Sequence, residues 1–335
     1  MIITKTPFRV SFFGGGTDYP AWYEKHGGTV LSTTIDKYCY ISTRYLPPFF
    51  DHKYRIRYTK REEVKTIDEI EHPKVREGLN LLNVKRGIEM IHSSDIPAMS
   101  GMGSSSAFTV GFLHALHALE GRMVSKHDLA LRAILLEQDI IKENVGSQDQ
   151  VSAAFGGFNR IEFRGRHSIS VNPITIASER QEELEKNLML FFTGLPREAS
   201  EIAREQIANI PKKQEELEIM KKMVDRAAEL LHDSRKPLDD FGRLLHETWT
   251  VKKNLSSKIT NPEIDEIYAA GMRSGALGGK LLGAGGGGMM LFYVPSESHK
   301  KVREVLRHLI HIPFRFERLG SQVVYYDPKA DLPVE

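Results

Sequence analysis

The chain has 335 residues, of which 41% are hydrophobic and 27% are charged, and its formal net charge is +2 at neutral pH. This length exceeds one ordinary hydrophobic core and suits two domains. The near balance of charge argues against nucleic acid or an anionic membrane as the main partner. Cys39 is the only cysteine, so no disulfide can form within the chain, and we expect a reducing, cytoplasmic compartment.

The apolar segments do not have the form of a targeting or membrane sequence. Lys5 and Arg9 interrupt the apolar residues at the N-terminus, so we expect no signal peptide. The longest uncharged apolar stretch covers residues 281–294 and is short and rich in glycine, so it cannot span a bilayer. We therefore expect no membrane partner, while the oligomeric state, a homodimer included, stays open.

The first half of the chain mixes strand-like and helix-like segments. β-branched and aromatic residues predict a strand or hairpin over 29–45 and further strands over 53–58 and 158–163. A nearly continuous apolar run predicts a buried helix over 105–119. Ser125 and the acidic residue three positions later form the pattern of a capping box, which predicts a helix from 126 to about 143.

The second half begins with a change of composition. The polar run 178–187 marks a domain boundary, and we divide the chain into residues 1–182 and 183–335. Beyond it we expect an apolar strand over 188–193, a helical region over about 197–274, and a final series of strand 289–294, helix 297–309 and strands 313–317 and 322–326. Strands and helices that form separate layers favour an α+β fold over a parallel doubly wound sheet.

A run of glycine and serine residues leads directly into the first apolar helix. Gly101 and Gly103 allow the backbone to approach a ligand closely and to adopt positive φ. Ser104, Ser105 and Ser106 offer hydroxyls and free N–H groups where the helix dipole adds positive charge. These features predict an anion site with a triphosphate as its occupant. A serine N-cap alone would not need so many glycines and serines.

Glu137 is a single charge on an apolar helix face. The residues that form this face are Ala130, Ala133, Ile134, Ile140 and Ile141. A buried carboxylate is costly unless a cation pairs with it. The partner is either a metal ion or a buried Arg or Lys. We favour Mg²⁺, which binds through one or two protein oxygens together with substrate phosphates.

Asp149 follows Glu137 by 12 positions, beyond a loop. It suits a general base, or an electrostatic partner for a hydroxyl nucleophile. It equally suits the N-cap of a short helix over 150–155. The sequence leaves both interpretations open.

Two further glycine runs lie near the ends of the chain. Gly14 to Gly16 form a tight loop that presents Thr17 and Asp18. An aspartate beside glycines is usually a turn residue, but the permanent cation Arg9 at the head of the same segment favours a functional role. The run 283–288 leads into an apolar strand, which favours a structured loop over a flexible linker.

These segments together resemble the GHMP kinases, a family that includes galactokinase, homoserine kinase and mevalonate kinase. Residues 97–107 are similar to the phosphate-binding signature of the family, with Met102 in place of the usual leucine. Residues 7–14 resemble the first family motif and 283–288 the third, in family order. The resemblance implies an N-terminal domain like domain 2 of ribosomal protein S5 and a ferredoxin-like C-terminal domain, with the site between them.

The resemblance also implies roles for individual residues. Asp149 and Arg9 would be catalytic: Asp149 would orient or deprotonate the acceptor hydroxyl, and Arg9 would steady Asp149 and the transferred phosphoryl group. ATP and Mg²⁺ would be the cofactors, with Mg²⁺ held by Ser105 and Glu137. The neighbouring Ser104 or Ser106 could take the place of Ser105. The nucleotide would contact Gly101, Met102, Gly103, Ser104, Ser105 and Ser106. The sugar would contact Gly16, Thr17 and Asp18, and Arg197 is a hypothesis for binding a distal phosphate, as are Lys252 and Lys253.

Within the family, the nearest similarity is to kinases of D-glycero-D-manno-heptose 7-phosphate. It depends on residues 9–20, 100–108 and 191–194. Galactokinases carry Glu-His where this chain has Gly15-Gly16, which argues against plain galactose. The resemblance implies phosphorylation of C1 to a 1,7-bisphosphate, for nucleotide-activated heptose and surface polysaccharide. The alternatives are another sugar 1-kinase, for L-fucose or a related hexose, a non-catalytic metabolite-binding protein, and an ATP-dependent decarboxylase of the same superfamily.

Overall fold

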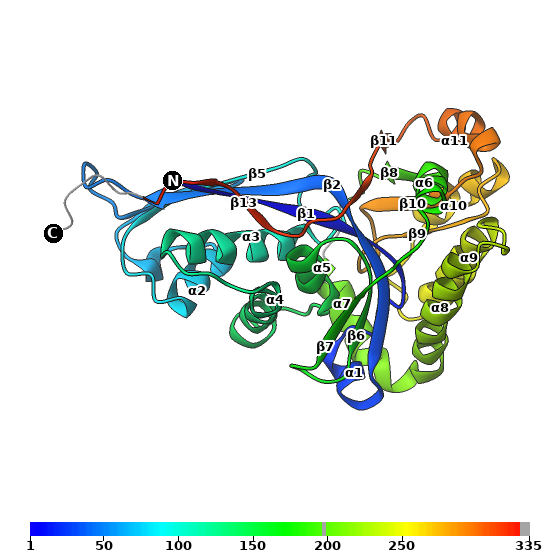
Figure 1. Ribbon diagram of the computed structural model, residues 1–335, viewed down its shortest axis with the longest axis horizontal. Helices are drawn as coiled ribbons and strands as arrows, with labels where there is room; N and C mark the ends of the chain where they lie inside the picture. The colour runs from blue at the N-terminus through cyan, green and yellow to red at the C-terminus, as the bar shows by residue number, and fades with distance from the viewer. Residues whose placement is uncertain (196–198, 329–335) are drawn as a thin grey trace.

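The computed structural model describes residues 1–195 and 199–328, which form two β-sheets and the helices that cover them (Figure 1). The larger sheet has nine strands, and its main path runs β13-β1-β2-β5-β3-β4. β6 and β12 pair with β2, and β7 pairs with β6. Its strands are β1 (Ile2–Phe13), β2 (Gly28–Tyr45), β3 (Tyr54–Arg57), β4 (Arg61–Val64), β5 (Ile88–Ser94), β6 (Phe158–Phe163), β7 (Ile169–Pro173), β12 (Phe316–Glu317) and β13 (Gln322–Tyr326).

The helices of the N-terminal half pack mainly on one side of this sheet, as Figure 1 shows for α2, α3 and α4. They are α1 (Pro20–His26), α2 (Pro73–Leu81), α3 (Ser104–Leu119), α4 (Lys126–Ile134) and α5 (Gln148–Phe155), with a 3₁₀ turn, η1 (Ile67–Glu69). Helix α3 lies against β1 and β2 and is buried along most of its length, as its apolar sequence predicts.

The C-terminal half contains an antiparallel four-stranded sheet of order β11-β8-β10-β9. Its strands are β8 (Leu188–Phe192), β9 (Gly278–Leu281), β10 (Met289–Tyr293) and β11 (Ile310–Ile312). Its helices are α6 (Ser178–Asn187), α7 (Ala199–Asn209), α8 (Gln214–His232), α9 (Asp239–Lys253), α10 (Pro262–Arg273) and α11 (His299–Val305), with short turns η3 (Ile210–Lys212) and η4 (Ser296–Ser298). The α+β prediction is confirmed. No helix in 1–195 or 199–328 is long and apolar enough to cross a bilayer.

Several expected elements take a different form. The segment over 29–45 is one continuous strand, β2, because its first half pairs with β6 and its second half with β5. The polar run 178–187 is a helix, α6. The helix expected through 143 changes after Ile134 into a π-helical segment, η2 (Leu135–Ile140), a form that is common at functional sites.

The end of the chain returns to the larger sheet. β12 pairs with β2, and β13 pairs with β1 along the sheet edge. The division at 182/183 stays a prediction, and it did not include this return. Sequence periodicity predicts that a strand exists but not which sheet it joins, because that choice depends on where the preceding turns place the chain.

A buried polar network joins η2 to three helices. The Glu137 carboxylate has no exposed surface, and the Lys74 ammonium of α2 donates to its Oε1 at 2.7 Å. From α3, the Ser106 and Thr109 hydroxyls donate to it at 2.9 and 2.5 Å, and the Gln150 amide of α5 also donates. Burial alone would raise the pKa of Glu137, but Lys74 and the other donors outweigh burial and hold that pKa below its ordinary value.

We expect Lys74→Met to destabilise the fold by about 3–5 kcal/mol, because it leaves the Glu137 carboxylate buried without its cation. Urea denaturation at pH 7, where both partners are charged, would measure the loss. The matched control is the double variant Lys74→Met/Glu137→Gln, which should recover most of the stability because no buried charge remains unpaired. A single variant that loses less than about 1 kcal/mol would show that the pair is not required.

Candidate active site

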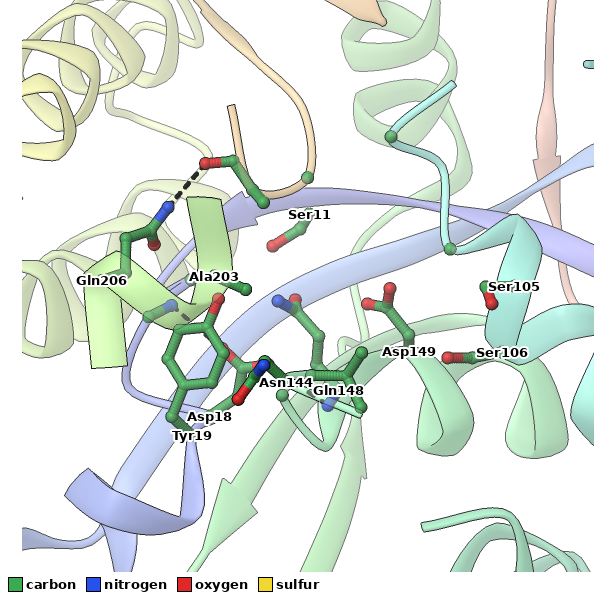
Figure 2. A pocket seen from close by; sticks show the side chains of 18 of the residues that line it. Ser11, Asp18, Tyr19, Ser105, Ser106, Asn144, Gln148, Asp149, Ala203 and Gln206 are labelled. Atoms are coloured by element: carbon green, nitrogen blue, oxygen red, sulfur yellow. Dashed lines mark hydrogen bonds between the residues drawn. The ribbon is translucent and has the colours of Figure 1, made fainter. Parts of the chain in front are cut away.

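A cavity of about 530 Å³ lies where the glycine-rich loops of the two halves meet (Figure 2). Four segments form most of its wall: the end of β1 with the loop after it, the start of α3, the loop before α5, and the loop after β9. The sequence marked all four segments for their glycine, serine or acidic residues. The fold brings them together around one space.

The start of α3 forms a cradle for an anion. Gly101 and Gly103 have φ of 87° and 74°, a left-handed conformation that favours glycine. Gly103 is the N-cap residue of α3 and, as a glycine, has no side chain to cap it, so the first N–H groups of the helix remain available beside the cavity. The serines of the first turn line the cavity, whereas the Met102 side chain is fully buried. Met102 contributes its carbonyl, which accepts from the Arg9 backbone N–H at 3.0 Å.

The glycine run 283–288 packs directly on this cradle. Gly288 has φ of 100°, and a Cβ atom there would lie 2.3 Å from the Ser100 carbonyl oxygen. Only glycine allows this approach. The run is therefore a structured loop, as the sequence favours, and Gly283 and Ala284 line the cavity.

Arg9 holds Asp149 in a two-pronged ion pair. The Arg9 Nε and Nη2 atoms donate to the two carboxylate oxygens at 2.8 and 2.9 Å, and Nη1 donates to the Gly101 carbonyl at 2.7 Å. This geometry requires the planar fork of arginine. Asp149 lies in the first turn of α5, after the N-cap residue Ser147, so the N-cap interpretation is wrong. Its side chain keeps 24% of its surface exposed and lines the cavity.

Asp18 is a second carboxylate of the cavity wall. The Gly16 and Gln148 backbone N–H groups donate to it at 2.9 and 3.4 Å. Burial, followed by the negative charge of Asp149, raises the pKa of Asp18. Gly146 packs so tightly on this carboxylate that a Cβ atom there would lie 1.9 Å from its Oδ2. Asp18 is thus fixed in position beside the cavity.

Thr17, unlike Asp18, does not line the cavity. It is fully buried, and its hydroxyl donates to the carbonyls of Gly14 and Thr29 at 2.8 and 2.9 Å. Its role is to close the loop, so we do not keep Thr17 among the sugar contacts. Gly16 lines the cavity, and Arg197 lies outside the described residues.

Lys74 occupies the place beside Glu137 where the sequence favours a magnesium ion. Its ammonium lies 2.7 Å from the Glu137 carboxylate, 3.0 Å from the Glu143 carboxylate and 2.6 Å from the Ser105 hydroxyl. A cation already occupies the centre of this set, and hydroxyl and carboxylate oxygens are the ligands that Mg²⁺ prefers. Ser106 contacts Glu137 directly, whereas Ser105 reaches it through Lys74. Of the two partners predicted for Glu137, a metal ion or a buried lysine, the structure shows the lysine, and Mg²⁺ at this carboxylate stays a prediction.

Sequence reasoning missed two cations of this region. Lys74 lies 63 positions from Glu137 and has no local pattern that marks it. Lys280 lies shortly before the glycine run 283–288, where a lysine is ordinary, yet it is 2% exposed and lines the cavity. Lys252 also lines the cavity, and its ammonium donates to the carbonyls of Leu281 and Gly283.

Comparisons with known proteins agree with this architecture. Residues 65–157 match the GHMP kinases N terminal domain, and residues 227–311 match the GHMP kinases C terminal domain. A protein from Campylobacter jejuni, named D-glycero-alpha-D-manno-heptose 7-phosphate kinase, is 30% identical over 95% of this chain and 97% of its own length. The L-fucokinase/L-fucose-1-P guanylyltransferase of Bacteroides fragilis is 27% identical over 89% of this chain and 35% of its own.

A solved structure shares the fold along nearly the whole chain. It is a D-glycero-D-manno-heptose 1-phosphate kinase from Bacteroides thetaiotaomicron, with a TM-score of 0.77 at 23% identity, covering 97% of this chain and all of its own. The two domain matches lie in family order, and the cradle at α3 and the glycine loop 283–288 meet at one cavity. The chain therefore belongs to the GHMP kinase family and is an ATP-dependent kinase with an alcohol group as acceptor.

Proposed function

We propose that this kinase transfers the γ-phosphoryl group of ATP to the C1 hydroxyl of D-glycero-D-manno-heptose 7-phosphate. The product would be the 1,7-bisphosphate, a precursor for nucleotide-activated heptose. The observation that carries the proposal is the Arg9–Asp149 pair, which places a carboxylate between the α3 cradle and the Asp18 wall of one cavity. The similarity to the Campylobacter jejuni kinase supports the heptose phosphate as acceptor.

Each part of the reaction has a matching group in the cavity. The N-terminus of α3 would bind the nucleotide phosphates, because its free N–H groups and dipole attract negative charge. Asp149 would accept a hydrogen bond from the acceptor hydroxyl and take its proton as the oxygen bonds to phosphorus. A loose transition state delays the loss of that proton, so a carboxylate is a sufficient base.

Arg9 would act in two ways. Its guanidinium orients Asp149 through both carboxylate oxygens. Its positive charge also lies beside the cradle, where negative charge moves toward the leaving nucleotide during transfer. Mg²⁺, when held by Ser105 or Ser106 with Glu137, would supply further neutralisation of the phosphate charge.

The heptose phosphate carries a distal charge that needs a cation. Of the lysines considered, Lys252 lines the cavity, while Lys253 pairs with Asp265 and lies over the Trp249 ring. We therefore assign the distal phosphate to Lys252, with Arg197 as the second candidate from the sequence. The similarity to an L-fucokinase keeps an unphosphorylated sugar as the alternative acceptor.

A panel of acceptors would test the substrate. The purified chain with Mg-ATP should phosphorylate heptose 7-phosphate, and phosphorus NMR should show a new phosphate on C1. The panel should include the same heptose without its phosphate, heptose 1-phosphate, L-fucose and mannose 6-phosphate. Turnover of L-fucose at a higher kcat/KM than heptose 7-phosphate would overturn the assignment in favour of the alternative.

The variant Asp149→Asn would test the catalytic pair. Asparagine keeps the shape but cannot accept the proton, so we expect kcat to fall by roughly 10²–10⁴-fold. The KM for ATP should stay near its normal value, because the α3 cradle is unchanged. ADP release would give the rate, and a thermal melt would verify folding. Asp139→Asn is the matched control, because Asp139 pairs with the exposed Arg166 away from the cavity. A fall of less than threefold would contradict the role of Asp149.

A further inference from the structure

The side chain of Lys280 extends from the C-terminal half of the chain and contacts the N-terminal half. It belongs to β9 of the smaller sheet, yet its ammonium donates to the carbonyl of Phe12 in β1 at 2.8 Å. The side chain is 2% exposed and lines the cavity. A buried lysine at this place costs free energy that an ordinary strand residue would avoid.

The ammonium of Lys280 has more donors than acceptors around it. It offers three N–H donors, and within residues 1–195 and 199–328 the Phe12 carbonyl is its one hydrogen-bond partner. Burial, followed by the positive charge of Arg9, lowers the pKa of Lys280 to about 7, and Asp18 partly offsets this shift. Buried donors in native proteins normally find partners, so a ligand oxygen in the cavity would complete the set.

Two other polar atoms of residues that line the cavity have no hydrogen-bond partner among the described residues. The Ser11 hydroxyl, one residue before Phe12, and the Gln148 Oε1 atom are both buried and make no hydrogen bond among the described residues. Both residues line the cavity, and both lie within 4 Å of where a Cβ atom on Gly15 would be. Figure 2 shows them on the same side of Asp149.

The combination of these atoms indicates the chemistry of the ligand. Lys280 donates, Gln148 Oε1 accepts, and the Ser11 hydroxyl can do either. A sugar hydroxyl both donates and accepts, so it satisfies such a set. A phosphate would instead meet the amide oxygen and the nearby Asp18 carboxylate, which repel it.

We propose that Lys280, together with Ser11 and Gln148, forms a subsite that binds hydroxyl groups of the acceptor sugar. The subsite is distinct from that of the distal phosphate, and it rests on the proposed function of the cavity as a sugar kinase site. Because Lys280 comes from β9 and Ser11 from β1, the acceptor would be held by both halves of the chain. Lys280 thereby helps to select a polyhydroxyl acceptor.

The variant Lys280→Met removes the donor while keeping the length of the side chain. Loss of this donor leaves the acceptor hydroxyl unpaired in the cavity, so we expect the KM for the acceptor to rise by roughly 10- to 100-fold. The KM for ATP should change by less than about twofold. Lys221→Met is the matched control, because Lys221 also donates to a backbone carbonyl, that of His26, but is not part of the cavity wall. It should leave both KM values unchanged.

A second variant makes the test independent of the buried lysine. Ser11→Ala should raise the acceptor KM several-fold without changing the KM for ATP, even if Lys280→Met fails to fold. Monodeoxy analogues of the acceptor complete the design. An analogue that lacks the bound hydroxyl should lose affinity for the unaltered enzyme but lose little more in the Lys280→Met variant, because the contact is already absent.

Three outcomes separate the possibilities. Normal acceptor KM in both Lys280→Met and Ser11→Ala would overturn the subsite while leaving the kinase proposal in place. A larger loss in Lys280→Met for phosphorylated than for unphosphorylated acceptors would assign the lysine to phosphate and overturn its role as a hydroxyl ligand. An unaltered enzyme that phosphorylates no sugar or sugar phosphate would contradict the proposed function, and the subsite with it.

Discussion

The guanidinium group of Arg9 is the contact on which the geometry of the cavity depends. It binds Asp149 through two donors and the Gly101 carbonyl through a third, while the Arg9 backbone N–H binds Met102. A strand, the anion cradle and a helix are therefore fixed to each other by one buried side chain. Burial of the cation is tolerable because each contact is a charge-assisted or backbone hydrogen bond.

The site combines charges of both signs, which suits phosphoryl transfer. The Lys74–Glu137 pair lies behind the start of α3, and Asp149 and Asp18 face the cavity. Burial raises the pKa of Asp18 and lowers that of Lys280, so both groups gain by contact with a polar ligand. An enzyme that does little covalent chemistry needs such an arrangement, because positioning and charge neutralisation supply most of the catalysis.

Local anomalies in the sequence marked much of the candidate site. A carboxylate on an apolar stripe pointed to Glu137, and glycines with serines before an apolar helix pointed to the α3 cradle. Such anomalies carry information because burying a charge costs free energy, and fixing the backbone of a glycine costs conformational entropy. Lys74 and Lys280 could not be found in this way, since a lysine in a polar helix or beside glycines is ordinary.

The sequence alone determined the α+β class, the apolar helix α3 with its glycine-serine start, and the family, because these depend on local spacing and on motif order. Only the tertiary structure decided that β12 and β13 return to the first sheet, that Lys74 pairs with Glu137, and that Lys280 crosses between the two halves. These contacts join residues far apart in the chain, and their energies depend on distances that only the folded backbone sets.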